Sequence, residues 1–206
     1  MISFAISFIV FVGFFSLFII LMCILDGKQA LPAWNAFAKQ LGLVPYLETG
    51  FFANFFSIDN KVQGRYRNHD IILKGDNYYY YNRERYEMRS ISSLSVNISN
   101  PKNVSMSICP KSFEFFSMPS HEDMKTGNYQ FDKLFKIQGN EKREIQKILD
   151  SWIQTKILNL HKPKKFYMGI DGKIAHVSEN GLIKDVDTLI SITDILIDIV
   201  EKLEDS

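Results

Sequence analysis

The feature that most constrains this chain is an uncharged stretch near its N-terminal end. Residues 2–25 read ISFAISFIVFVGFFSLFIILMCIL and hold no Asp, Glu, Lys or Arg, although 23% of the whole sequence is charged. As a helix rising 1.5 Å per residue, this stretch reaches roughly 36 Å, which exceeds a bilayer hydrocarbon core of about 30 Å. We therefore expect residues 1–25 to form a single transmembrane helix rather than a buried core helix.

A cleaved signal peptide is the main alternative to a permanent anchor. No basic segment precedes the stretch, its apolar part is longer than a signal sequence needs, and no A-x-A cleavage pattern follows it. A lipoprotein signal is set aside because Met22, and not a small residue, precedes Cys23. Lys28 and Lys39 follow the stretch and no cation precedes it, so the positive-inside tendency places the soluble domain in the cytoplasm. The prediction is a single-pass membrane protein held in the lipid bilayer by residues 2–25.

Composition narrows the classes of protein that remain. Lys and Arg number 24 against 23 Asp and Glu, and the net charge of +1 argues against nucleic-acid binding through bulk charge. Residues 26–42 predict a juxtamembrane helix, because Trp34, Phe37 and Leu41 repeat at helical spacing and Gly42 suits the helix end. Trp34 fits either an interfacial membrane anchor or a core side chain, and the sequence leaves both open.

Strand patterns occupy the next part of the chain. From about residue 50 to 118, apolar residues alternate with polar ones at the period of two expected for β-strands. The clearest hairpin covers residues 61–74, with Asn68-His69 as its turn and Tyr66 opposite Ile71, which gives one core face and one wet face. Further strands are predicted over residues 78–81, 93–98, 104–109 and 113–116, with residues 100–103 as a turn between the second and third of these.

Helical patterns dominate the C-terminal part. Asn140 is a candidate cap for a helix over residues 141–160, and Pro163 would stop it. A last helix is expected from about residue 186 to 203, with Asp185 or Asp187 as its cap.

A second hairpin lies between these helices, over residues 166–177 around Asp171-Gly172, with Tyr167 opposite His176. Together the patterns predict an α+β fold. A single N-terminal transmembrane helix would precede one antiparallel-sheet domain over residues 43–206, with packed helices near the C-terminus.

Four features of the sequence together resemble those of a known group of proteins. The N-terminal anchor, the hairpin YRNHDIIL of residues 66–73, the segment GNYQFDKLFKI of residues 127–137 and the long helix after it resemble uncharacterised bacterial membrane-anchored proteins. Those proteins have an N-terminal transmembrane helix and an α+β soluble domain, and the resemblance covers most of the soluble part. It implies a bacterial origin and brings no activity, cofactor or site residues with it.

Motifs that carry catalytic chemistry are missing from the sequence. It has no Walker A loop, no G-x-G-x-x-G, no G-x-S-x-G, no H-E-x-x-H and no C-x-x-C. None of the four histidines is spaced as a metal ligand with another, so we assign no catalytic, cofactor-binding or metal-binding residue and expect no cofactor. An enzyme whose site forms only on folding is the second alternative function, and a cluster of His176, Tyr167 and carboxylates would favour it.

A basic, tyrosine-rich stretch covers residues 61–89. On a membrane-tethered domain, each cation near anionic headgroups contributes about 1 kcal/mol. An ordinary solvated sheet face with internal ion pairs is the plainer interpretation. The candidate headgroup or partner contacts are Arg65, Arg67, Lys74, Arg83 and Arg85.

The final helix is more apolar than an ordinary surface helix. It bears a narrow acidic stripe, and apolar residues cover the rest of its circumference. Burial against the sheet explains this pattern, and docking of a protein partner through a surplus apolar edge is the alternative.

The sequence thus predicts a membrane-tethered, non-enzymatic interaction or scaffold protein. A lipid-headgroup or membrane-surface sensing module is the first alternative, and a nucleic-acid partner is not expected. The acidic stripe of the final helix, where either kind of protein contact is considered, consists of Asp187, Asp194, Asp198, Glu201 and Asp205.

Overall fold

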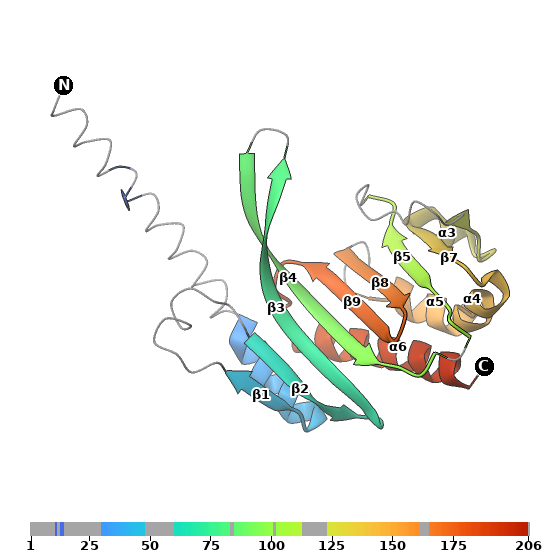
Figure 1. The fold of residues 1–206 in the computed structure, drawn as a ribbon, viewed down its shortest axis with the longest axis horizontal. Helices are drawn as coiled ribbons and strands as arrows, with labels where there is room; N and C mark the ends of the chain where they lie inside the picture. Colours follow the sequence, from blue (N-terminus) through green and yellow to red (C-terminus); the bar gives the residue numbers. More distant parts are fainter. Residues whose placement is uncertain are drawn as a thin grey trace.

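The computed structural model describes residues 11, 13, 14, 30–47, 60–82, 85–100, 102–112, 123–160 and 165–205. Within these ranges the chain is α+β, and its strands form one antiparallel sheet (Figure 1). The strands are β1 (Val44–Leu47), β2 (Asn60–Tyr66), β3 (His69–Asn82), β4 (Arg85–Asn97), β5 (Met106–Pro110), β6 (Asp123–Met124), β7 (Phe135–Gly139), β8 (Phe166–Asp171) and β9 (Ile174–Asn180). The labelled helices are α3 (Tyr129–Leu134), α4 (Lys142–Ile148), α5 (Ser151–Leu158) and α6 (Val186–Glu204), and residues 30–41 form a further helix.

The sheet has nine described strands in the order β1-β2-β3-β4-β9-β8-β5-β7-β6. The hairpin of β8 and β9 therefore lies between β4 and β5. Residues 100–103, expected as the turn between two neighbouring strand runs, instead lead from β4 to β5, which lies three places away in the sheet. The Asn100 side chain organises this connection, since it accepts a hydrogen bond from the Val104 N–H and donates one to the Val104 carbonyl.

The first predicted hairpin forms with its turn one residue earlier than expected. Arg67 and Asn68 occupy the turn with φ values of 47° and 69°, and Gly64, not Tyr66, lies opposite Ile71. Both residues adopt the left-handed backbone that a two-residue hairpin turn favours. Because the register differs by an even number of residues, the predicted faces survive. Val62 and Leu73 are buried on the core side.

The second hairpin also forms with a shifted register. Gly172 is the first turn residue, with a φ of 56°, and His176 lies opposite Gly169 rather than opposite Tyr167. Tyr167 and His176 remain on one face as diagonal neighbours, and their ring centroids are 5.4 Å apart.

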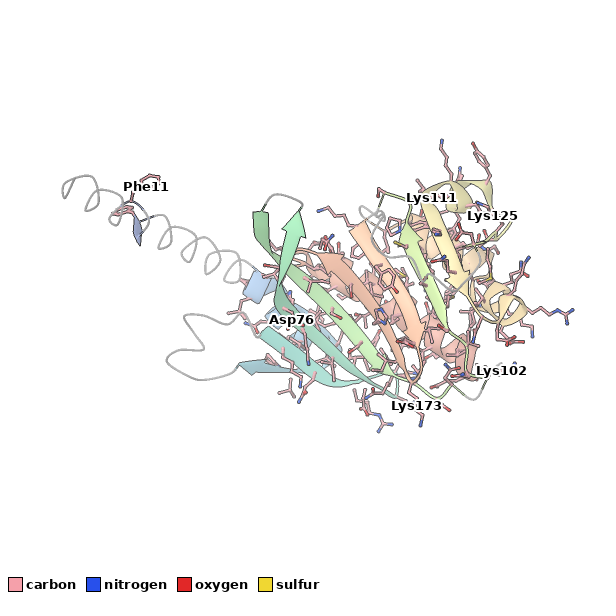
Figure 2. The ribbon with its side chains drawn as sticks, turned by 45° about the horizontal axis from the view of Figure 1, so that its top comes forward. Phe11, Asp76, Lys102, Lys111, Lys125 and Lys173 are labelled. Atoms are coloured by element: carbon pink, nitrogen blue, oxygen red, sulfur yellow. The ribbon has the colours of Figure 1, made fainter. Side chains whose placement is uncertain are left out.

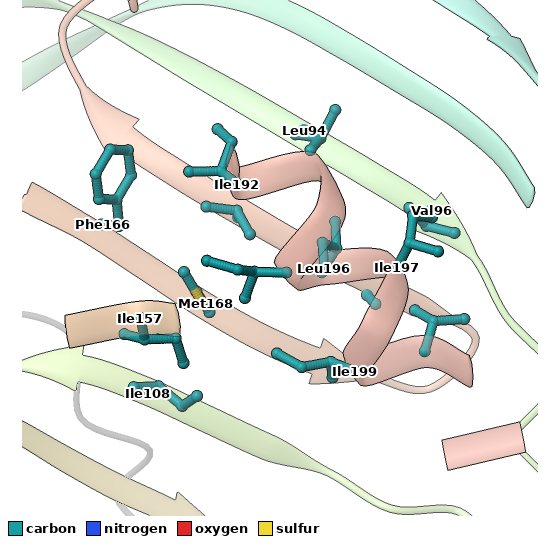
Figure 3. Packing of buried hydrophobic residues seen from close by; sticks show 14 of the residues in the cluster. Leu94, Val96, Ile108, Ile157, Phe166, Met168, Ile192, Leu196, Ile197 and Ile199 are labelled. Carbon is teal, nitrogen blue, oxygen red and sulfur yellow. The ribbon is translucent and has the colours of Figure 1, made fainter. Parts of the chain in front are cut away.

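The core lies between one face of the sheet and the helices. Figure 1 shows α5, α6 and the helix of residues 30–41 on the same side of the sheet. In Figure 3, Leu196 and Ile199 of α6 point towards Met168 of β8 and Ile108 of β5, and these side chains are at most 2% exposed. Along β5 every residue is buried, so this strand is covered on both faces, whereas alternate residues of β2 and β3 are exposed.

The predicted helix over residues 141–160 is two helices. The chain breaks at Leu149 and Asp150, because Asp150 has an extended ψ of 175° and its carboxylate caps α5 by accepting from the Ile153 N–H. Asn140 does not cap α4, whose N-cap is Glu141 without a side-chain hydrogen bond. The Asn140 side chain instead bonds to the backbone of Asn103 and Ser105.

The helix of residues 30–41 docks on the domain. Trp34 is 1% exposed and its indole N–H donates to the Ile183 carbonyl at 2.8 Å, while Phe37 is fully buried. Of the two placements left open for Trp34, the structure shows the core side chain.

Two expected elements fall largely outside the described residues. The strand expected over residues 113–116 is not among them. Of the expected transmembrane helix, only Phe11, Gly13 and Phe14 are described, and all three are helical. Figure 2 draws Phe11 apart from the sheet. In the described ranges, no helix combines the length and apolar character needed to cross a membrane.

Replacement of Gly139 by alanine should destabilise the domain by about 3 kcal/mol. A Cβ at this position would lie 2.3 Å from the Ser105 carbonyl oxygen and 2.4 Å from Cδ1 of Ile145, and the backbone atom cannot move aside cheaply. The thermal unfolding midpoint of the full chain measures this effect. Gly172→Ala is the control, since a Cβ there meets no atom within 4 Å and only the positive φ opposes it. Equal losses in both variants would contradict the steric explanation.

Candidate functional site

The sequence-predicted cations do not form one site. Arg65 and Lys74 are exposed on the sheet face opposite the helices, and Arg65 lies directly across from Asp70. Arg83 lies outside the described residues, and only the backbone of Arg85, at the start of β4, is described. Acidic residues therefore interrupt the cationic face where it is described.

Arg67 makes ion pairs within the chain. From the β2–β3 turn its guanidinium reaches α6, where it pairs with Asp198 at 2.8 Å and with Glu201. Burial opposes the charge on Arg67, but the hydrogen bond to Asp198 and the two carboxylates outweigh it and raise the pKa of Arg67. This arginine links the β2–β3 turn to α6 through its two ion pairs.

Asp198 is the centre of this link. Its side chain is 5% exposed and also accepts from Nζ of Lys156 on α5 at 2.6 Å, so one carboxylate joins the hairpin turn, α5 and α6. Tyr66 extends the network, since its hydroxyl donates to Asp194 at 2.9 Å. Burial, and then this hydrogen bond, raise the pKa of Tyr66.

A groove of about 420 Å³ lies beside this network, between the end of α5 and the N-terminal half of α6. Asp187 and Ser191 are exposed on its α6 wall, and the buried side chains of Leu160 and Ile195 contribute an apolar part. The groove has three lining carboxylates and one ammonium group, that of Lys156, which is already paired with Asp198. Its chemistry suits a ligand with positive charge and a short apolar stem. The lining carboxylates are those of Asp185, Asp187 and Asp194.

The apolar surface of α6 is used within the chain. Its apolar residues from Ile192 to Leu203 are at most 2% exposed, so the wide apolar arc is explained by burial under the sheet and α5. Of the remaining residues of α6, Asp187, Ser191 and Glu204 are exposed, and Val186, Ile190 and Asp194 are partly buried.

Sequence reasoning found the acidic stripe but missed the groove. The stripe follows from helical spacing alone, whereas the groove depends on where α5 ends beside α6. The position of the groove depends on the helix break at Asp150, which sets the direction of α5. The sequence signals this break locally, because Asp150 followed by Ser151 suits the start of a helix.

Other chemistry is sparse in the described ranges. There, no group of three or more His, Cys, Asp or Glu side chains is arranged to hold a metal ion. Among protein-family models, curated proteins and solved structures, no significant match to this chain was found.

Proposed function

We propose that this protein is a membrane-tethered interaction domain that binds a basic segment of a protein partner in the groove between α5 and α6. The observation that carries the proposal is the concave, carboxylate-lined groove on the exposed edge of a helix that is otherwise buried. A Lys or Arg side chain fits such a groove, because its aliphatic stem can contact Leu160 and Ile195 while its charge meets Asp187 and Asp194.

The tether of the proposal is the uncharged stretch of residues 2–25. Its support is the sequence, together with the exposure of Phe11 and Phe14, at 67% and 74%, on helical backbone. Phenylalanine is usually buried in folded proteins, and contact with lipid would remove this surface from water. Lys28 and Lys39 favour a cytoplasmic position for the domain.

The interaction is tested by crosslinking and pull-down of the full chain from native membranes, with a tag at the C-terminus. The variant Asp187→Lys with Ser191→Arg reverses the charge of the groove and leaves Asp198 and its ion pairs intact. We expect it to recover at least tenfold less of a stoichiometric partner than the native chain does. The native chain should also release that partner as salt concentration rises.

The matched control reverses charge on the opposite face, through Arg65→Glu with Lys74→Glu. Retention of the partner by this control, with loss in the groove variant, supports the proposal. The reverse pattern would place the contact on the sheet face. If the bait returns alone from both native and variant membranes, the interaction proposal is wrong, and headgroup contact through Arg65 and Lys74 becomes the better explanation.

The tether has its own test in the full chain. Phe11→Arg with Phe14→Arg should move the protein out of the membrane fraction that resists alkaline carbonate, since each arginine at the centre of a span costs about 2.5–3.5 kcal/mol. Phe11→Leu with Phe14→Leu should stay in that fraction. Extraction of the native chain by carbonate would contradict a membrane span.

A further inference from the structure

A second cluster of polar side chains lies on the sheet face opposite the helices. Ser107 of β5 is the direct partner of Gly169 of β8, and Gly169 is the direct partner of His176 of β9. Direct partners in antiparallel strands share a face, so the three residues form a row across the sheet with the glycine in the middle. This row lies on three strands that meet only because the β8–β9 hairpin lies between β4 and β5.

The hydroxyl of Ser107 is exceptional among the described residues. It is 1% exposed, and Oγ is the described buried side-chain oxygen or nitrogen that lacks a hydrogen-bond partner. Buried polar groups are nearly always paired, and an exception in a native fold calls for an explanation such as backbone strain, a catalytic role or a bound water or ion.

Gly169 gives the imidazole of His176 its position. A Cβ at residue 169 would lie 2.9 Å from Cε1 and 3.1 Å from Nε2 of His176. The ring therefore occupies the space above the glycine that lies between His176 and Ser107 in the row, and no hydrogen bond joins it to the Ser107 hydroxyl. Any larger residue at 169 would push the imidazole away from the row.

The surroundings of His176 favour a neutral ring that can accept a proton. Burial lowers its pKa below the ordinary value, and the carboxylate of Asp171 on β8 opposes this shift. Tyr167 of β8 contacts the ring, and β4 contributes Ser95 opposite His176. Farther along the same face, burial raises the pKa of Cys109, and Lys136 opposes this.

From this geometry we propose that Ser107 is a nucleophile for acyl transfer, with His176 as its general base and an ester or thioester as the acyl donor. The Ser107 Oγ forms a bond to the acyl carbon while its proton passes to Nε2 of His176. The bond from the acyl carbon to the leaving oxygen or sulfur then breaks, and His176 returns the proton to the leaving group. Water releases the acyl group by the same steps. Asp171 stabilises the imidazolium that forms in between, and the partly exposed ring of His176 moves to admit the donor.

The test uses a fluorophosphonate probe on the full chain in detergent. Attack by Oγ forms a P–O bond, the P–F bond breaks and fluoride leaves, so the product is a stable phosphonylated serine. We expect mass spectrometry of peptides from the native chain to place the adduct on Ser107. The labelling rate should be constant above the pKa of His176 and fall below it, with a midpoint lower than pH 6.5.

Variants separate this chemistry from structural effects. Ser107→Ala should lose the adduct, and His176→Gln and Gly169→Ala should each label at least tenfold more slowly. Ser178→Ala, on the same face of β9, should label like the native chain. Absence of a Ser107 adduct in the native chain, an adduct on another residue, or a labelling rate unchanged in His176→Gln would overturn the proposal. The groove of α5 and α6 is not involved, so partner binding and labelling succeed or fail separately.

Discussion

Trp34→Ala is expected to cost about 4 kcal/mol of unfolding free energy. Trp34 is 1% exposed, and its removal leaves a cavity between the helix of residues 30–41 and the rest of the core. For a domain of this size the thermal midpoint should fall by roughly 8–16 °C, at about 2–4 °C per kcal/mol. Circular dichroism of the full chain measures this midpoint.

Two further variants make this result specific. Trp34→Phe keeps most of the packing but removes the indole N–H that bonds to the Ile183 carbonyl, so it should lose about 1–2 kcal/mol. Trp152→Ala is the matched control, since Trp152 is 49% exposed and, within the described residues, the Lys156 ammonium lies over its ring and that of Lys202 lies farther off. Its loss should stay below about 1 kcal/mol. A Trp34→Ala chain as stable as Trp152→Ala would mean that the docked helix contributes little.

Patterns along the chain predicted the parts of the fold that local chemistry decides. The final helix forms over Val186–Glu204 with the Asp185 cap, because Asp185 is followed by a long apolar repeat. The core face of the first hairpin was also correct, since alternation sets it and a register change of an even number preserves it. The predicted position of the turn, Asn68-His69, was wrong by one residue. Only Asn68 in this segment favours a positive φ, and it fits either position of a two-residue turn.

Which two residues form the β2–β3 turn is linked to a contact that is distant in the sequence. Arg67 occupies the other turn position, and its guanidinium is held by carboxylates more than 130 positions later in the sequence. The order of the strands likewise could not be predicted from local patterns. In the sheet β8 and β9 separate β4 from β5, and this order creates the row of Ser107, Gly169 and His176. Spacing within one strand or helix carries no information about which strands become neighbours.

Asp198→Ala should cost about 3 kcal/mol, because it leaves the charges of Arg67 and Lys156 without their shared partner in a partly buried place. The two cations are 38% and 34% exposed, so solvent screens them and keeps the loss at the low end for a broken buried pair. The measurement is the thermal midpoint of the full chain, as for Trp34. The Tyr66 hydroxyl and Asp194 should keep their hydrogen bond, so the loss reports the Asp198 link itself.

Controls distinguish this buried link from ordinary surface charge. Glu201→Ala removes the more exposed partner of Arg67 and should cost less than about 1 kcal/mol, an effect that added salt weakens. Lys156→Met with Asp198→Leu replaces a charged pair by apolar side chains and should recover part of the stability lost in Asp198→Ala. Equal losses for Asp198→Ala and Glu201→Ala would contradict the central place of Asp198. If the double variant is less stable than Asp198→Ala, the pair itself holds α5 on α6, and the groove between them depends on it.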